Sequence, residues 1–436
     1  MQKKKKMRPP PNTGETGAPK IKEFNITRLD NGVRIITERV PYVESFAMGI
    51  SVRAGSRDEA YELPGVAHFL EHAAFRRTKT RTSRQIAAQF ESLGAYSNAF
   101  TTQELTCFFV RGLKRSYKKC AELLSDVVLN PKFHPGEFEK EKNVILEEVK
   151  YYEDDPEESI FDFGDAALFG EHPLGNPIVG SKASLEKIQI KDLEEFHSNY
   201  YIPENIVITA AGNVDHDDIA DVFSKYFSDL KSAAAVSPRS LPNRPNPSYL
   251  EKNMPFQQAH ILFGRRVPGI DSADRFTLSI LNIIIGDGMS SRLNFAIREK
   301  AGAAYTVYSN LALYDDCGAL YLYAGADEAQ SRRTIEMTND ELIKLKSKPI
   351  RKAEFERGRE QLTSGLIMDM ESMSSRMQSL GKFAFIENGL ENARETINKI
   401  NSVTIDDVNR IACEISDPES WSKIIFLPEE ETEIEN

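Results

Sequence analysis

The alternation of apolar and polar positions predicts short strands separated by helices in the first half of the chain. Residues 26–29 and 33–36 form two apolar-rich runs around Asp-Asn-Gly at 30–32, which is typical of a hairpin because Asn-Gly tolerates positive φ. Further strands are predicted over 45–54 and 105–113, and helices after the Pro-Gly at 64–65 and over 83–93, 115–129 and 136–153. Mixing of the two element types predicts an α+β fold.

The second half of the chain repeats the first. Residues 232–247 are rich in Pro, Ser and Ala and lack apolar periodicity, which is typical of a linker. Short matches lie on either side of it at offsets of 209 to 217 and in the same order: 95–96 with 304–305, 137–139 with 354–356, and 190–193 with 405–408. These matches predict two tandem homologous domains, 24–231 and 248–428, each a mixed and mostly antiparallel sheet packed with helices. Chance similarity between two unrelated domains is the alternative.

The beginning of the chain differs in charge from its body. The first 22 residues hold seven basic residues and one acidic residue, so they carry +6 of the net charge of −11 and leave −17 for the rest. We interpret residues 1–23 as a disordered basic leader, with a targeting role as the alternative, and residues 429–436 as an acidic tail. The leader has no apolar segment of the kind found in secretory signals, so we expect a cytoplasmic protein; a periplasmic or organellar location stays open.

Composition excludes several classes of protein. The 436 residues are 40% hydrophobic, which argues against a disordered or collagen-like chain. No apolar run approaches ~20 residues, so no membrane span is predicted, and the acidic body argues against nucleic-acid binding. The four cysteines are widely spaced, which argues against a cysteine-based zinc site and a disulfide framework.

The strongest chemical signal is the segment His68-Phe69-Leu70-Glu71-His72. On a helix, His68 and His72 lie one turn apart on one face, where both imidazoles can reach one Zn²⁺ ion. Glu71 lies beside them and can act as the general base on a water held by the metal. The pattern H-x-x-E-H is a zinc peptidase motif. A solvated His-Glu-His stripe on a helix surface is the alternative.

The helix predicted over 136–153 offers a third ligand. On a helical wheel with Phe138 as origin, Glu147 points away from the buried face, whereas Glu148 and Glu141 share one flank of it. A catalytic zinc requires three protein ligands and one open position, and we predict Glu148 as the third ligand. We predict that Glu141 orients a ligand histidine or tunes the site. Both could instead be ordinary glutamates on a helix surface.

These motifs resemble those of the pitrilysin, insulin-degrading enzyme and mitochondrial processing peptidase family. The resemblance rests on 67–75 with Glu148 placed 76 residues after His72, on 94–101 with the polar residues after it, and on 298–305. It covers roughly residues 24 to 428, and the length is most similar to the short processing-peptidase branch. One departure is Arg77, where many relatives have Gly. Another is the short glycine segment 286–289, which lacks the features needed for phosphate binding.

The resemblance implies a zinc endopeptidase that hydrolyses unfolded peptides inside a closed chamber, with one Zn²⁺ per chain. It implies that Tyr305 donates to the oxyanion and that Arg298 grips the substrate backbone. We expect the substrate to add as a strand along the edge near Tyr96, Asn98 and Ala99. The branch works as dimers of two-domain chains, so we expect a homodimer, with a heterodimer possible.

The second half is predicted to lack a zinc site of its own. The repeat register places Gly358 and Gly365 where Glu141 and Glu148 would fall, and no second H-x-x-E-H occurs. A non-catalytic or assembly subunit of a heteromeric processing peptidase is the alternative function.

Overall fold

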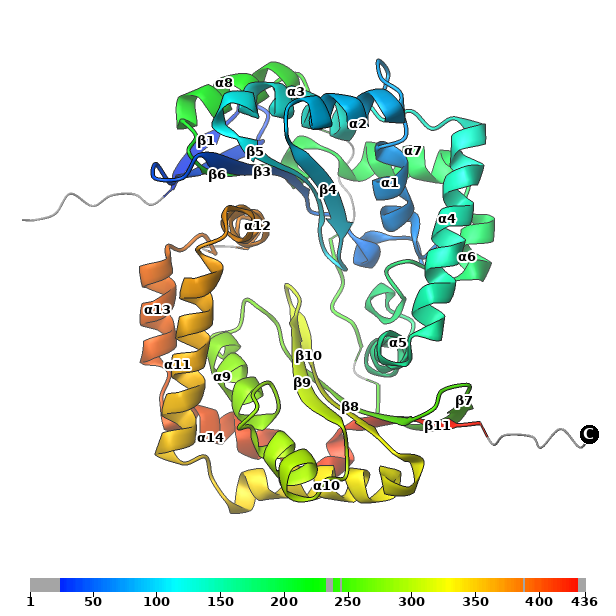
Figure 1. Cartoon of the computed structure of the whole chain (residues 1–436), viewed down its shortest axis with the longest axis vertical. Coiled ribbons are helices and arrows are strands. Elements are labelled where there is room, and N and C mark those ends of the chain that lie inside the picture. Colours follow the sequence, from blue (N-terminus) through cyan, green and yellow to red (C-terminus); the bar gives the residue numbers. More distant parts are fainter. Residues whose placement is uncertain (1–23, 233–237, 244, 387–388, 430–436) are drawn as a thin grey trace, which may run out of the picture.

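The computed structural model describes residues 24–232, 238–243, 245–386 and 389–429. The predicted leader and nearly all of the acidic tail lie outside this part of the chain. Two mixed sheets packed with helices occupy the two halves of the molecule (Figure 1), which confirms the predicted fold class.

The first sheet has the strand order β1-β2-β6-β3-β5-β4, in which β2 and β6 are parallel and the other neighbours antiparallel. Its strands are β1 (Asn25–Arg28), β2 (Arg34–Arg39), β3 (Ser45–Val52), β4 (Tyr96–Thr101), β5 (Thr106–Leu113) and β6 (Ile206–Gly212). The helices of this half are α1 (Val66–Ala74), α2 (Ser83–Ser92), α3 (Tyr117–Leu129), α4 (Pro135–Asp154), α5 (Pro156–Phe169), α6 (Lys182–Lys187), α7 (Ile190–Tyr200) and α8 (His216–Phe227).

The second sheet has the order β7-β11-β8-β10-β9, with β7 and β11 parallel and the other neighbours antiparallel. Its strands are β7 (Tyr249–Met254), β8 (Ala259–Pro268), β9 (Thr306–Leu313), β10 (Cys317–Ala326) and β11 (Ser422–Pro428). The helices of this half are α9 (Arg275–Ile285), α10 (Ser331–Ser347), α11 (Lys352–Asp369), α12 (Met373–Phe383), α13 (Ala393–Ser402) and α14 (Ile405–Glu414), with a π-helix η5 (Asn294–Lys300) before β9.

Five strands of the first sheet therefore recur in the second, in the same spatial order and with the same senses. The sequence spacing agrees, because α11 begins 217 residues after α4 and β11 begins 216 residues after β6. A shared order that includes one parallel pair in the same place is the expected result of duplication.

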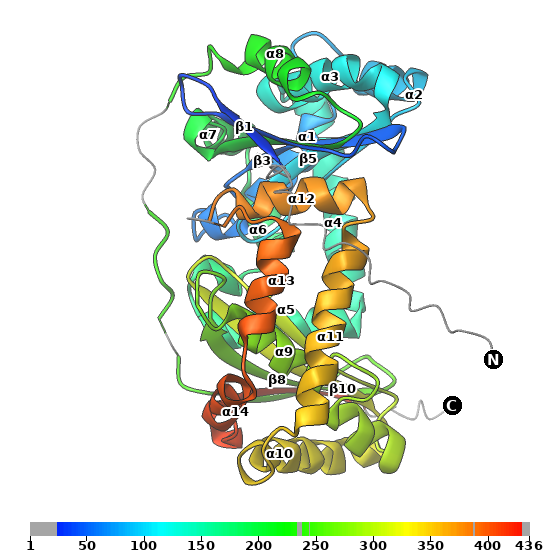
Figure 2. The same cartoon turned by 90° about the vertical axis from the view of Figure 1, so that its left-hand side faces the viewer.

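Each sheet buries one face against helices of its own half and the other face against a helix from the opposite half. On the first sheet, Ile36, Ala47 and Cys107 pack against Met377 and other side chains of α12. On the second sheet, α5 packs against side chains of β8, β10 and β11 through Ile160, Leu168 and Phe169, and these are joined by Leu262, Tyr321 and Phe426. The exchange is visible in Figures 1 and 2, where α12 lies beside the first sheet and α5 beside the second. Neither half completes its core alone.

Charged side chains join the halves near the predicted linker. The described part of 232–247 contains no helix or strand, and Arg239 in it donates to Asp58 at 2.7 Å and to Asp315 at 2.8 Å. Arg57, which is almost fully buried, pairs with Glu104 and with Asp316. This network links the β4–β5 turn to the β9–β10 turn, so it fixes how the two halves face each other.

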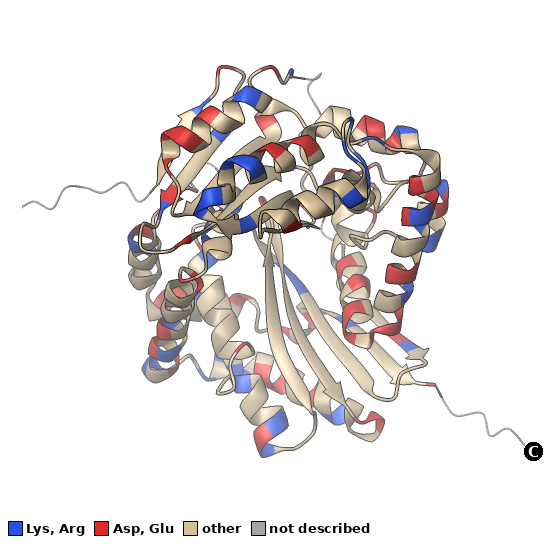
Figure 3. Cartoon of the chain, turned by 45° about the horizontal axis from the view of Figure 1, so that its top comes forward, with Lys and Arg blue, Asp and Glu red and all other residues tan. Residues whose placement is uncertain are grey.

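The surface carries charges of both signs. Figure 3 shows acidic and basic positions interspersed along the outer helices, while the sheets are mostly free of them. Among the described residues, no helix has the length and apolar character needed to cross a membrane.

Candidate metal centre and its cavity

The proposed zinc ligands lie on two helices that pack against each other, α1 and α4. Helix α1 starts after Gly65, whose φ of 98° is left-handed and therefore favours glycine. The first turn of α1 is held by the side-chain carboxyl group of Glu59, which accepts from Gly65 N at 2.9 Å and from Ala67 N at 2.7 Å. Burial raises the pKa of Glu59 to about 8. A buried carboxyl group thus replaces the missing side-chain cap of the helix that carries the H-x-x-E-H motif.

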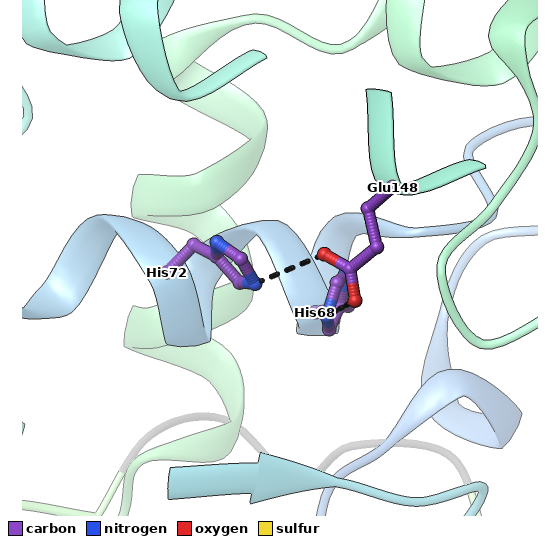
Figure 4. A group of neighbouring side chains, drawn as sticks. All are labelled: His68, His72 and Glu148. Atoms are coloured by element: carbon purple, nitrogen blue, oxygen red, sulfur yellow. Dashed lines mark ion pairs between the residues drawn. The ribbon is translucent and has the colours of Figure 1, made fainter. Parts of the chain in front are cut away.

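His68, His72 and Glu148 converge as predicted (Figure 4). Their ligand atoms all lie within 4.8 Å of one another. Nε2 of His68 is 3.7 Å from one oxygen of Glu148, and Nε2 of His72 is 3.5 Å from the other. These separations are longer than hydrogen bonds, and they match the roughly 3.4 Å between two ligands of a tetrahedral ion with bonds of about 2.0–2.2 Å. The donor set of two imidazoles and one carboxylate therefore fits Zn²⁺.

The protonation of the two imidazoles differs. Burial and the neighbouring His72 lower the pKa of His68 to about 3, so its ring is neutral and able to coordinate a metal at neutral pH. Burial also disfavours charge on His72, but the hydrogen bond with Glu141 and the charge of Glu148 outweigh it and raise the pKa of His72. Negative charge is therefore concentrated where a cation would bind.

Glu141 lies behind His72, as the helical wheel predicted. Its Oε1 is 3.0 Å from His72 Nδ1, and its side chain is only 2% exposed. Burial alone would raise the pKa of this carboxyl, but hydrogen bonds from His72 and Arg76 lower it below its ordinary value. An ionised carboxylate here keeps the proton of His72 on Nδ1 and leaves Nε2 free for the metal. Glu147, the neighbour that the wheel placed toward solvent, has a side chain that is 73% exposed.

Glu71 is buried beside the ligands. Thr101 Oγ1, at the end of β4, donates to Glu71 Oε2 at 2.6 Å, and the second oxygen of Glu71 has no hydrogen-bond partner within the described part of the chain. Burial raises the pKa of Glu71, and the bond from Thr101 opposes the rise. A carboxylate with a raised pKa next to a metal is suited to accept and return a proton.

A cavity of about 530 Å³ opens in front of these residues. The first half contributes the ligands, Glu71, Ala99 and Thr101, and the second half contributes Asn310, Ala312, Tyr314 and Tyr321. A second cavity of about 640 Å³ shares Phe100, Gln103, Ala312 and Tyr314 with the first. The two cavities therefore adjoin each other between the two halves of the chain.

Three further carboxylates line the first cavity: Glu158, Asp162 and Asp165, all on α5. Burial and the neighbouring Glu158 raise the pKa of Asp162 to about 7. Burial raises the pKa of Asp165 to about 7 as well, and this group accepts a hydrogen bond from Tyr321. The cavity therefore has an acidic wall that the sequence motifs do not predict, because it depends on the placement of α5 against the opposite sheet.

The other predicted substrate residues are only partly gathered at this cavity. Ala99 lines it, and β4 is an edge strand that pairs only with β5 within the described chain. Asn98 and Tyr96 do not line it, and instead Asn98 Nδ2 donates to the Tyr96 hydroxyl at 3.1 Å.

The Arg298–Tyr305 pair does not line the cavity either. Arg298 is exposed, and the exposed Tyr305 hydroxyl donates to Asp327 at 2.8 Å. Within a single chain, the structure does not bring these two residues to the metal ligands.

Sequence reasoning missed three residues that support the site. Thr101 belongs to the family-like segment 94–101, but that resemblance implies no role for it. Arg76 lies four residues after His72, and extending the i, i+4 series would have found it. Glu59 lies in a loop and carries no periodic signal, so only the fold identifies it as the cap of α1.

Comparisons with known proteins find relatives over most of the chain. The family model described as insulinase (peptidase family M16) matches residues 34–182, and the model described as peptidase M16 inactive domain matches residues 187–362. An uncharacterized zinc protease of Mycobacterium tuberculosis is 37% identical over 390 residues, which cover 88% of this chain and 89% of the relative. The uncharacterized zinc protease YmxG of Bacillus subtilis is 35% identical over 382 residues, which cover 88% of this chain and 93% of the relative.

Solved structures share the fold. A protease from Helicobacter pylori superposes with a TM-score of 0.85 at 22% identity, covering 93% of this chain and 99% of its own. A protein described as peptidase M16 inactive domain from Pseudomonas fluorescens gives a TM-score of 0.86 at 20% identity, covering 93% of this chain and 98% of its own.

Proposed function

The chain belongs to the insulinase family, peptidase family M16, and we propose that it is a zinc-dependent endopeptidase that hydrolyses unfolded peptides with one Zn²⁺ per chain. One observation carries the proposal: His68, His72 and Glu148 converge beside Glu71 at the wall of a cavity large enough for several residues of a peptide. The names of the relatives support a zinc protease.

In this proposal the chain's own residues divide the work of peptide hydrolysis. His68, His72 and Glu148 would hold the zinc, which when bound supplies a Lewis acid that makes water more acidic and polarises the scissile carbonyl. The oxygen of Glu71 that Thr101 leaves free accepts the proton of the attacking water. Glu71 then delivers that proton to the nitrogen of the leaving amine. Thr101 keeps the Glu71 carboxylate aimed at the cavity.

The shape and charge of the cavity support an extended substrate with a basic residue. A peptide added along β4 would run past Ala99 toward the metal ligands, since the outer edge of β4 is unpaired in the described residues. Glu158 and Asp162 on the acidic wall would pair with a Lys or Arg side chain of that peptide. A narrow interior between two sheets would exclude folded proteins.

We further propose that Arg298 and Tyr305 act on a substrate bound by a second copy of the chain. Both residues are exposed and lie outside the cavity of their own chain. In a homodimer in which the second half of one chain faces the first half of the other, they would contact the substrate bound by the other chain. In the test, E71Q and Y305F chains, each inactive alone, are mixed and reassembled. Recovery of about a quarter of the wild-type activity is expected in a statistical mixture, in which half of the dimers carry one intact site of two, whereas no recovery would contradict action between chains.

The enzyme proposal is tested by metal analysis and cleavage of a quenched unfolded peptide. Wild-type protein is expected to hold one zinc per chain and to cleave. E71Q is expected to keep the zinc and to lose activity by the roughly 10²–10⁴-fold typical of a general base. Full activity of E71Q would show that another group is the base. Zinc-loaded wild-type protein that cleaves no unfolded peptide would point instead to a non-catalytic subunit of a heteromeric processing peptidase.

A further inference from the structure

The facing sides of α1 and α4 carry a row of ligands and charges, and this row continues past the end of α1 into the turn that holds Arg76. His68, His72 and Arg76 follow one another at intervals of four residues, and Glu148 and Glu141 lie two turns apart on α4. Glu148 faces both histidines, and Glu141 lies between His72 and Arg76. Arg76 therefore follows the ligand His72 in this series and contacts the same carboxylate, Glu141.

Arg76 holds both oxygens of Glu141. Its Nη2 donates to Oε1 at 2.8 Å, and its Nε contacts Oε2, so the guanidinium grips the carboxylate with two nitrogens. Such a two-point contact fixes the plane of the carboxylate as well as its position. The same Oε1 also accepts a hydrogen bond from His72 Nδ1. The direction in which Glu141 meets the imidazole is therefore set by Arg76.

Only one of the two histidines is oriented in this way. Nδ1 of His68 is buried and has no hydrogen-bond partner in the described part of the chain, whereas Nδ1 of His72 has Glu141. Orientation of the imidazole pair toward the metal therefore depends on the His72 side. We propose that Arg76 is a positioning residue for zinc binding, acting on His72 through Glu141. This inference rests on the proposed function, because it assumes that the site takes zinc.

The second half of the chain shows that helices corresponding to α1 and α4 can pack together without this series of charged side chains. There, α11 packs against α9, the elements that correspond to α4 and α1 in the shared order. Gly358, at the position of Glu141, lies against Ile280 and Ile284, and a side chain there would meet Ile284 at 3.0 Å. The same helix pair therefore packs through apolar contacts where no metal ligands exist. The Arg76–Glu141 pair is explained by the ligand it supports and not by the fold.

Arg77 provides a matched control. It is the next residue in the chain, it pairs with Glu137 of the same helix α4 at 2.7 Å, and its side chain is exposed to a similar degree as that of Arg76. Neither Arg77 nor Glu137 contacts a ligand histidine in the described structure. Loss of the Arg77–Glu137 pair removes a comparable ion pair and leaves the contacts of Arg76 with Glu141, and of Glu141 with His72, in place.

The experiment measures zinc affinity of the full-length apo-protein by competition with a chromogenic chelator for the wild type, R76M, R76K and R77M. R76M is expected to bind zinc about 10-fold more weakly, at the lower end of the 10–100-fold loss typical of a direct partner of a metal ligand, because Arg76 acts only through Glu141. R76K, which keeps the charge but loses the two-point grip, is expected to fall between R76M and the wild type. R77M is expected to stay within about twofold of the wild type.

A double-mutant cycle distinguishes an effect of Arg76 that passes through Glu141 from a general loss of protein stability. In an E141Q background, R76M is expected to change zinc affinity by less than about twofold, because its route to His72 is already broken. Equal losses from R76M in both backgrounds, or unchanged affinity of R76M, would overturn the inference. If wild-type protein binds no zinc, the proposed function fails and the inference fails with it; if wild type and R76M bind equally, the inference alone fails.

Discussion

The acidic wall of the cavity makes a quantitative prediction about substrate preference. Asp162 lies on α5 facing the cavity that also holds Glu148, and Glu158 lies one turn earlier on the same helix. Replacing Asp162 by Asn keeps the shape of the side chain and removes its charge. The matched substrates are two quenched unfolded peptides that differ only in one residue, arginine or its neutral isostere citrulline.

The size of the effect follows from the setting of Asp162. A hydrogen bond to a charged partner contributes about 1.5–3 kcal/mol, which corresponds to about 10- to 150-fold in kcat/KM. Because Asp162 is only partly buried and faces an open cavity, we expect the lower end, about tenfold, in favour of arginine. D162N is expected to lose most of that preference. E153Q, which changes an exposed carboxylate outside the cavity, is expected to retain it.

The same preference should depend on pH. Burial and Glu158 raise the pKa of Asp162 to about 7, so in the free enzyme this group is neutral below pH 7 and charged above it. The ratio of kcat/KM for the arginine and citrulline peptides should therefore rise between pH 6 and pH 8 in the wild type and stay flatter in D162N. A wild-type ratio near one at pH 8, or an unchanged ratio in D162N, would refute the assignment of this wall as a site for basic side chains.

Three further predictions concern the ligand helices and the shared cores. E148Q is expected to weaken zinc binding, measured by chelator competition, by more than the roughly 10–100-fold loss seen when a residue that only hydrogen-bonds a ligand is replaced. E147Q, which changes a solvent-exposed side chain on the same helix, should leave zinc affinity unchanged. Equal effects of the two variants would remove Glu148 from the ligand set. E59A leaves two buried backbone amides at the start of α1 without their acceptor, which costs about 1–3 kcal/mol for each amide. Urea unfolding should therefore show a clear loss of stability, and zinc binding should be weaker. Wild-type stability together with wild-type zinc affinity would show that this cap is dispensable. M377A removes a fully buried side chain of α12 from the first sheet and should cost about 2–5 kcal/mol within one cooperative transition; unfolding of one half alone would show that the cores are independent.

Much of the candidate metal site could be predicted from sequence because its determinants are local. His68, Glu71 and His72 occupy one helix, so the spacing of 3.6 residues per turn decides which face they share. Glu141 and Glu148 were selected in the same way on α4, and the structure brings them to the two sides of His72. What a single helix determines can be read from its periodicity.

Residues whose role depends on distant segments could not be predicted. Thr101 reaches Glu71 only because β4 ends beside α1, and Asp162 reaches the cavity only because α5 crosses to the opposite sheet. Arg298 and Tyr305 show the reverse case: the resemblance implies a role at the site, yet the chain holds them away from its own cavity. A sequence motif identifies residues, but it does not show whether they lie at the site of their own chain.

The sequence by itself predicted the α+β elements, the internal repeat and the H-x-x-E-H motif on one helical face, since hydrophobic periodicity, turn residues and helical spacing are properties of short segments. Only the tertiary structure decided the exchange of α5 and α12 between the halves, the acidic wall that this exchange creates and the grip of Arg76 on Glu141. The physical reason is that a sheet face can be covered by any apolar helix of suitable size, so its choice of partner depends on chain connectivity and packing across hundreds of residues.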